Sequence, residues 1–371
     1  MKKLSDNPTI LKSIPQDLTT IRLASEIRLR REYFGGLVYD TRNGNTLEVD
    51  KEAFQFLDLT GNRTVRIDHL LTLLVRNRII KHSYRTIGGT LGKLFELNIF
   101  EHSNEPPSSP VLAEQNNVSH KPWLSAPETV HWAVTQRCDE NCPDCYARRS
   151  SVMITELNTR EALKLIEKIA GWGVFQLAIG GGEPFARQDL SQLVHHAAAL
   201  GLSVHITTGK SHIDPRILED LSDSIKNLQL GLRPDDLLGP DSRKRIQQIQ
   251  SLFTTIQSIG ITPGANIFLT KSAIRQITGL VKRLVHIGFH RIILLRYKPP
   301  ESIERWKAEN PKPYQMKKLH EEISNIIQQN PQLNIRVDCS LSFIQRHLPS
   351  KLANQFGIKK RMEIGTDQIT K

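Results

Sequence analysis

The sequence predicts an α/β protein, in which an incomplete (βα)6 barrel of the TIM type follows a small winged-helix domain. The barrel is predicted because, from residue 128 on, strand-length apolar runs alternate with helix-length amphipathic segments. Such alternation indicates parallel βαβ units with right-handed crossovers, which curl into a barrel. The winged-helix domain is predicted because a hairpin pattern and three helical patterns precede that region.

The predicted N-terminal domain covers residues 1–101. Residues 20–48 read as strands, and Asn43-Gly44 is a strong hairpin turn signal. Helical patterns follow at about 51–59, 67–76 and 84–97. A hairpin with three short helices is typical of a winged-helix module.

Residues 102–127 contain five prolines mixed with Ser and Asn, which predicts an extended linker. The barrel is expected over 128–338, and a short C-terminal region over 339–371. Barrel strands are predicted near 129–135, 175–179, 203–208, 227–232, 263–269 and 291–296, with a further candidate at 333–338. Helices are predicted near 159–170, 188–200, 214–224, 241–258, 272–287 and 313–329.

Composition describes a globular protein of 371 residues with a net charge of +12. Lys and Arg are spread along the chain, so the charge favours acidic partners without singling out nucleic acid. No stretch approaches membrane-spanning length, and no apolar run follows Met1-Lys-Lys, so neither a membrane segment nor a signal peptide is expected. Four cysteines, three of them clustered, fit the reducing cytoplasm.

The clustered cysteines Cys138, Cys142 and Cys145 have the spacing C-x3-C-x2-C, just after a strand-like stretch. Three thiolates on one loop can bind three irons of a cubane cluster and leave the fourth iron open. A structural zinc site usually needs a second pair of ligands nearby, and the only other cysteine is Cys339. Incidental thiols usually lie in apolar surroundings, whereas this loop is polar. The pattern therefore favours an iron–sulfur cluster over zinc or unligated thiols.

A glycine motif, Gly181-Gly182-Glu183-Pro184, follows the cysteine loop after one βα unit. By itself such a run is usually a tight turn and occasionally a phosphate loop. In a parallel barrel, however, the loops after the first and second strands meet at the same mouth, where chemistry is located. We therefore expect both motifs in one site.

The paired motifs resemble the signature of radical S-adenosylmethionine (SAM) enzymes, over about residues 128–340. The resemblance implies that Cys138, Cys142 and Cys145 bind a [4Fe–4S] cluster whose open iron chelates SAM. It implies that Gly181 to Pro184 lie against the methionine amino group, with Glu183 accepting a hydrogen bond from it. It also implies a 5′-deoxyadenosyl radical and an electron donor such as flavodoxin or ferredoxin. Which residue acts on the substrate is not predicted.

Further positions are compared with the family. Thr207 and Thr208 end the third strand, where their hydroxyls can reach the SAM ribose, although β propensity alone also explains them. Arg243 falls at the distance at which related enzymes place an arginine for the SAM carboxylate. Asp144 precedes the third cysteine, where the family favours an aromatic residue.

The N-terminal pattern resembles the PqqD-like recognition element of enzymes that mature ribosomally synthesised peptides (RiPPs). An ordinary winged helix that packs on the enzyme or contacts DNA remains an alternative. The resulting hypothesis is a radical SAM maturase that binds a precursor peptide through its leader, of the nitrogen-fixation type. The alternatives are a radical SAM enzyme acting on a small metabolite and a regulatory protein with a zinc or degenerate cluster site. Neither a membrane nor nucleic acid is expected as a partner.

The run Asp338-Cys339-Ser-Leu-Ser-Phe343 looks like the start of an auxiliary-cluster region, but no further cysteine follows. Either such clusters are lacking here, or the chain is truncated or frameshifted. A buried thiol is the simpler interpretation of one cysteine.

Overall fold

The computed structural model describes residues 20–76, 91–108, 123–140, 142–145, 155–300, 302–338 and 363–364. The chain divides into two compact units, one of Met1–Ala126 with Arg361–Lys371 and one of Pro127–Lys360. In the described part of the chain, no helix combines the length and the apolar character needed to cross a membrane.

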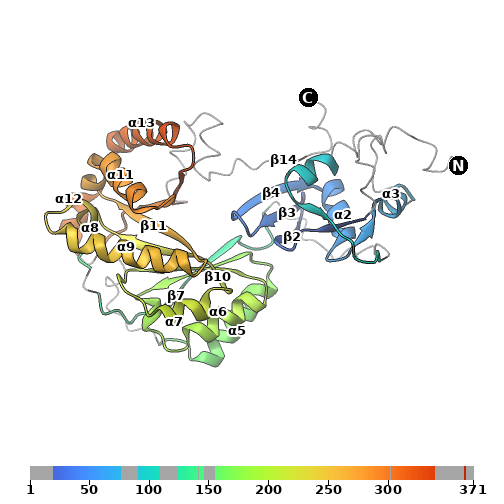
Figure 1. Cartoon of the computed structure of the whole chain (residues 1–371), viewed down its shortest axis with the longest axis horizontal. Helices are drawn as coiled ribbons and strands as arrows, with labels where there is room; N and C mark the ends of the chain where they lie inside the picture. The colour runs from blue at the N-terminus through green and yellow to red at the C-terminus, as the bar shows by residue number, and fades with distance from the viewer. Residues whose placement is uncertain are drawn as a thin grey trace. The chain divides into compact units, whose positions relative to one another are not determined.

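The N-terminal unit contains two small sheets and helices (Figure 1). One sheet has the order β14-β4-β3-β2 and the other β5-β1-β6. Their strands are β1 (Thr20–Leu23), β2 (Ile27–Glu32), β3 (Gly35–Asp40), β4 (Asn45–Asp50), β5 (Val65–Arg66), β6 (Phe100–His102) and β14 (Glu363–Ile364). The helices are α2 (Lys51–Thr60), α3 (Ile67–Arg76) and a short helix at residues 91–96.

The predicted hairpin is present, because β3 pairs with β4 in antiparallel register around the Asn43-Gly44 turn. Gly44 has a φ of 69°, a conformation that glycine adopts without strain. The predicted helices at 51–59 and 67–76 are present as well. The short strands β5 and β6 were not predicted, since each has only two or three residues and neither shows a period.

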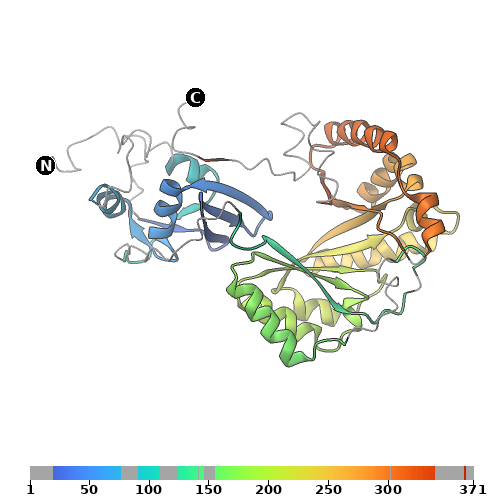
Figure 2. The same cartoon turned by 180° about the vertical axis from the view of Figure 1, so that it is seen from behind.

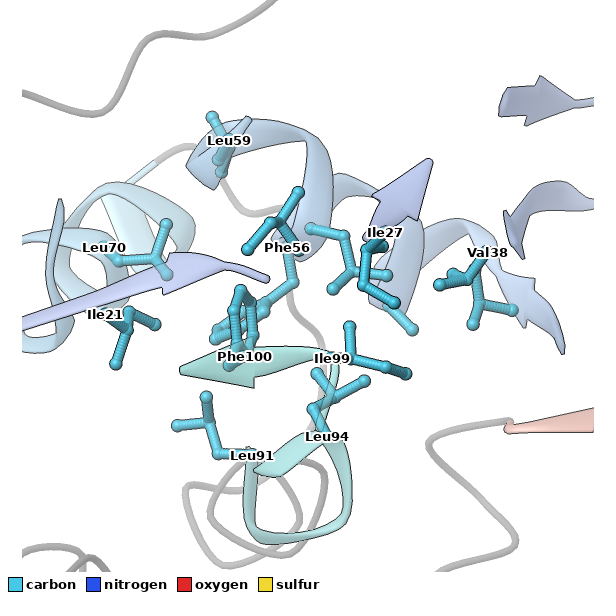
Figure 3. Packing of buried hydrophobic residues seen from close by; sticks show 14 of the residues in the cluster. Ile21, Ile27, Val38, Phe56, Leu59, Leu70, Leu91, Leu94, Ile99 and Phe100 are labelled. Atoms are coloured by element: carbon cyan, nitrogen blue, oxygen red, sulfur yellow. The ribbon is translucent and has the colours of Figure 1, made fainter. Parts of the chain in front are cut away.

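The core of the N-terminal unit forms where strands and helices from different parts of the sequence meet (Figure 3). Phe56 of α2 meets Phe100 of β6 edge-to-face, with ring centroids 5.7 Å apart. Leu57, Leu70 and Leu94 are completely buried beside them. The unit thus has its own hydrophobic core.

The second unit is a parallel sheet of seven strands in the order β13-β12-β11-β10-β9-β8-β7. Its helices lie on the outer face of the curved sheet (Figure 2). The strands are β7 (Thr129–Thr135), β8 (Gln176–Gly181), β9 (Ser203–Thr208), β10 (Ile225–Leu232), β11 (Thr262–Leu269), β12 (Arg291–Arg296) and β13 (Asn334–Val337). The helical elements are α5 (Thr159–Gly171), η3 (Pro184–Ala186), α6 (Leu190–Ala199), α7 (Pro215–Leu221), α8 (Pro234–Leu238), α9 (Ser242–Ser258), α10 (Lys271–Arg275), α11 (Ile277–Ile287), α12 (Ile303–Glu309) and α13 (Pro313–Gln329).

The sheet agrees with the predicted α/β barrel that does not close, because β7 and β13 are its two edges. The candidate strand at 333–338 is real and becomes the seventh strand, β13. The helix predicted at 272–287 is instead two helices, which meet at Gln276. The short helices α8 and α12 were not predicted, because five or seven residues are too few to show a helical period.

We predict that Gly36→Ala destabilises the N-terminal unit. A Cβ at Gly36 would lie 1.9 Å from the Phe54 ring, so the core would have to repack, at a cost of about 1–3 kcal/mol of unfolding free energy. The matched control is Gly92→Ala on the helix at 91–96, where a Cβ meets nothing within 4 Å. That control should stabilise the protein by up to about 1 kcal/mol. Urea unfolding followed by circular dichroism measures both, and equal effects would contradict the prediction.

Candidate active site

The glycine motif is hydrogen-bonded to the backbone that leads into the cysteine loop. Gly182 N donates to Thr135 O at 2.7 Å, and Glu183 N donates to Arg137 O at 2.8 Å. Thr135 ends β7 and Gly181 ends β8, so both loops leave the sheet at its carboxyl edge. The two motifs predicted to share one site therefore do lie together.

Two glycines are required by this contact. Gly181 has a φ of +116°, and a Cβ there would lie 2.6 Å from Thr135 O. A Cβ on Gly182 would lie 2.3 Å from Arg137 O. Any side chain at either position would push the glycine loop away from the residues preceding Cys138.

Two charged residues that the sequence did not single out hold the same backbone. Glu156 Oε1 accepts hydrogen bonds from Thr135 Oγ1 at 2.8 Å and from Gln136 N at 2.7 Å. The buried Arg187 donates to Val134 O at 2.6 Å, and it forms an ion pair with Asp189 at 2.7 Å. Sequence alone gave no signal for them, since the fold brings them to main-chain groups at Gln136 and Val134, and such groups carry no sequence pattern.

Glu183 is almost completely buried, and its carboxylate joins the ends of β8 and β9. It accepts hydrogen bonds from Thr208 Oγ1 at 2.9 Å, from Gly209 N at 3.0 Å and from Phe185 N at 3.2 Å. Burial raises the pKa of Glu183, and these three hydrogen bonds oppose that rise. Pro184 is buried next to it and begins η3.

The other predicted contacts have different surroundings. Thr207 is half-buried on the sheet face opposite the helices, where Asn266 Nδ2 approaches its hydroxyl at 3.4 Å. Arg243 is exposed in the first turn of α9. Arg245, two residues later, instead reaches the loop after β9 and donates to Gly209 O at 3.2 Å. It also lies 3.6 Å from the buried Asp236.

The three cysteines are free thiols on one loop, Cys138 exposed and the other two half-buried. Cys145 N donates to Cys142 O at 3.2 Å, which closes a turn between the second and third thiols. Burial raises the pKa of the Cys138 and Cys142 thiols, so iron binding would have to release their protons. Cys339 lies outside the described residues.

The donor set fits a cluster. All three donors are soft sulfur atoms, the ligands that iron–sulfur clusters prefer. Within the described ranges, no group of three or more His, Cys, Asp or Glu side chains gathers around a point that a single metal ion would occupy. A cubane cluster does not need side chains that converge on one point, since each thiolate binds a different iron.

Asp144, between the second and third cysteines, contacts residues that follow β12, near the opposite edge of the sheet. It accepts hydrogen bonds from Tyr297 and Arg305. Burial by itself would raise the pKa of Asp144, but these hydrogen bonds outweigh it and lower that pKa. The same environment raises the pKa of Tyr297, through burial and the neighbouring carboxylate.

The inner face of the sheet, meaning the face opposite the helices, is polar. His205 and Asn227 are hydrogen-bonded to each other at 3.0 Å, whereas Val204 and Ile206 of β9 point outward and are completely buried. Gln229 Oε1 and Asn266 Oδ1 are buried on the inner face and find no hydrogen-bond partner among the described residues. A barrel interior that served only stability would hold bulky apolar side chains in layers. Buried acceptors without partners instead suit a ligand that brings donors.

Comparison with known proteins agrees with this site. Residues 132–234 match the family model of the Radical SAM superfamily. A PqqA peptide cyclase from Xanthomonas campestris pv. campestris (strain B100) is 28% identical over 172 residues, which cover 45% of this chain and 46% of the relative. An AdoMet-dependent heme synthase from Methanosarcina barkeri (strain Fusaro / DSM 804) is 36% identical over 98 residues, 26% of this chain and 28% of the relative. The matches thus span less than half of these curated relatives.

The fold resembles that of Streptococcus suis SuiB. With SuiB bound to S-adenosylmethionine the TM-score is 0.64 at 20% identity, over 87% of this chain and 73% of SuiB. With SuiB bound to the precursor peptide SuiA the TM-score is 0.64 at 20% identity, over 93% of this chain and 81% of SuiB. At this identity the likeness concerns the fold. The family match, over residues 132–234, is to a superfamily of enzymes that use a [4Fe–4S] cluster and SAM.

Proposed function

We propose that this protein is a radical SAM enzyme that modifies a ribosomally synthesised precursor peptide. The observation that carries the proposal is the hydrogen bonding of Gly182 and Glu183 to the backbone before Cys138. It joins a three-thiol loop to a glycine loop at the mouth of an open parallel barrel, where catalytic groups are found. When bound, the cluster and SAM supply a 5′-deoxyadenosyl radical that abstracts hydrogen from the substrate.

The residues of the chain bind and orient these groups. Cys138, Cys142 and Cys145 would hold three irons, and the glycine loop, which is hydrogen-bonded to the backbone before them, would lie against the methionine part of SAM. Glu183 would accept a hydrogen bond from the SAM ammonium group, with its carboxylate already fixed by Thr208 and Gly209.

We assign the SAM carboxylate to Arg245 rather than to Arg243. Arg245 reaches the loop after β9, whereas Arg243 is exposed to solvent on α9. Thr207, on the inner face, remains the candidate for the SAM ribose. The unpartnered oxygens of Gln229 and Asn266 would accept hydrogen bonds from the peptide, because buried acceptors are costly when they stay unpaired.

We further propose that the N-terminal unit is a winged-helix, PqqD-like element that binds the leader of the precursor, and that the leader is of the nitrogen-fixation type. β2 is an edge strand among the described residues. Glu26 O accepts from Thr41 N, so the hydrogen-bonded positions of β2 alternate from Glu26, and Leu29 directs its main-chain N–H to the open edge. An extended peptide can add to such an edge.

The electron donor is proposed to be an acidic carrier such as flavodoxin or ferredoxin. A net charge of +12 favours encounter with a protein of opposite charge.

Anaerobic reconstitution with iron and sulfide tests the enzyme proposal. Wild-type protein and Gly180→Ala should each bind one oxygen-sensitive cluster and cleave SAM, since a Cβ at Gly180 meets nothing within 4 Å. Cys142→Ala should lose both properties because it lacks one ligand. Gly182→Ala should lose them because its Cβ would displace Arg137, next to Cys138. Stoichiometric zinc without sulfide in the wild-type protein would refute the proposal.

Glu183→Gln should weaken SAM binding by about 1–3 kcal/mol, the scale of a hydrogen bond to a charged group. The new amide would also face N–H donors that the carboxylate accepts now, so the side chain would be less well fixed. Glu156→Gln is the control, because one amide oxygen can still accept both of the hydrogen bonds that Glu156 Oε1 accepts. Calorimetry with the reconstituted enzyme measures both, and unchanged affinity in Glu183→Gln would remove Glu183 from the SAM site.

Leu29→Pro should weaken leader binding, because it removes an edge N–H without removing a hydrogen bond between β2 and β3. Leu29→Ala removes the same side chain but keeps the N–H, so it should bind the leader like the wild type. Calorimetry of the full chain with the leader of a precursor peptide, and separately with duplex DNA, gives the comparison. Tight DNA binding without peptide binding would contradict the leader proposal and leave the radical SAM core unaffected.

A further inference from the structure

The residue between the second and third cysteines makes a connection across the mouth of the barrel. Asp144 Oδ1 accepts hydrogen bonds from Tyr297 Oη at 2.8 Å and from Arg305 Nε at 2.6 Å. Asp144 Oδ2 accepts a third from an Arg305 terminal nitrogen at 3.1 Å. Arg305 thus binds both carboxylate oxygens, the two-point geometry that gives the strongest and most directional ion pairs. These contacts of Asp144, Tyr297 and Arg305 are called the mouth bridge.

The mouth bridge connects distant parts of the sheet. Asp144 lies in the loop after β7, an edge strand, whereas Tyr297 directly follows β12, near the opposite edge. The partners are 153 and 161 residues from Asp144 in sequence. Because all strands are parallel, their carboxyl ends meet at one edge, and the curvature of the sheet brings these two ends together.

Burial of the carboxylate distinguishes the mouth bridge from the exposed Asp139–Lys210 pair of the cysteine loop. The side chain of Asp144 is only 14% exposed and Tyr297 is 2% exposed, while the Arg305 side chain is 44% exposed. In contrast, Asp139 pairs with Lys210 at 3.0 Å while its own side chain is 66% exposed. Water and salt screen such an exposed pair, so it adds little rigidity.

The far side of the mouth bridge is itself well fixed. Ser302 caps α12 by accepting a hydrogen bond from Arg305 N at 3.1 Å, so Arg305 lies in a capped first helical turn. Trp306 Nε1 approaches Tyr297 O at 3.4 Å and holds α12 against the end of β12. Asp144 is therefore attached to a capped helical turn that is hydrogen-bonded to the end of β12.

We propose that Asp144 is a positioning residue, which holds the loop of Cys142 and Cys145 in its metal-binding position by attaching it to Tyr297 and Arg305. The importance of that position rests on the proposed function. The attachment itself uses only side chains of this chain, so it fixes the loop before any iron arrives. It also links the cysteine loop to the last strands of the barrel.

Two single variants and their combination test the positioning role. Asp144→Ala and Arg305→Gln should each speed hydrogen–deuterium exchange of residues 136–145, in protein without iron, on the order of tenfold, the effect of losing a charge-assisted hydrogen bond. In reconstituted protein, each should release iron to a chelator faster. The double variant should be no worse than the worse single variant, because both remove the same connection. Arg216→Gln is the matched control, since Arg216 forms an ion pair with Asp214 while its side chain is 86% exposed.

The outcomes separate this proposal from the enzyme proposal. Unchanged exchange of residues 136–145 in both folded single variants would overturn the positioning role, and so would fully additive effects in the double variant. If the wild-type protein bound no cluster, the enzyme proposal would fail, and exchange in iron-free protein would still decide whether Asp144 holds the loop. The electron paramagnetic resonance signal of the reduced variants with SAM is compared with that of the reduced wild-type protein with SAM. A broader or otherwise altered signal in the variants would further support positioning over a purely structural effect.

Discussion

The candidate site depends on a short stretch of main-chain hydrogen bonding between two loops. Gly182 and Glu183 donate to Thr135 and Arg137, and this places the cysteine loop beside the glycine loop. The pairing is possible only because no side chain stands between the two backbones at Gly181 and Gly182. Glu156 and Arg187 add side-chain hydrogen bonds to the same strand end, which is therefore held from several directions. The other contacts proposed for the site depend on this arrangement of the two loops.

The carboxylates around the site differ in burial, and therefore in how strongly they interact with their partners. Glu183 is buried, and hydrogen bonds from Thr208, Gly209 and Phe185 compensate for the lost water. Asp144 is nearly buried and paired with Arg305, whereas Asp139 is exposed and paired with Lys210. Because effective dielectric screening falls with burial, the two inner carboxylates fix geometry, and the outer pair contributes mainly to the surface potential.

The two faces of the parallel sheet have different tasks. The face under the helices is apolar and supplies the core, with residues such as Ile206 and Leu294 completely buried. The opposite face holds amide and imidazole groups, among them His205, whose pKa is lowered to about 4 by burial and by nearby Arg291. His205 is therefore neutral at physiological pH and can act as a hydrogen-bonding group without adding charge. A polar inner face held by an apolar outer face suits recognition of a polar substrate such as a peptide.

The sequence by itself determined the longer elements and the two motifs. The hairpin around Asn43-Gly44, the alternation of strands and helices after residue 128, and the loops of Cys138 and Gly182 follow from local patterns of polarity and turn chemistry. Sequence spacing also predicted correctly that both motifs would share the carboxyl edge of the sheet, because parallel βα units leave little choice.

The tertiary structure alone decided which side chains reach those motifs. Arg243 and Arg245 are both arginines near the start of α9, so the sequence does not say which one reaches the site. Only the orientation of α9 about its axis directs Arg245 to the loop after β9. Thr208 binds Glu183, while its neighbour Thr207 faces inward, because successive residues of a strand point to opposite faces. The partners of Asp144 lie more than 150 residues away in the sequence, and the local periodicity of polar and apolar residues does not reveal contacts at such separations. Curvature of the sheet brings them together, and curvature is a property of the packed layers rather than of any segment.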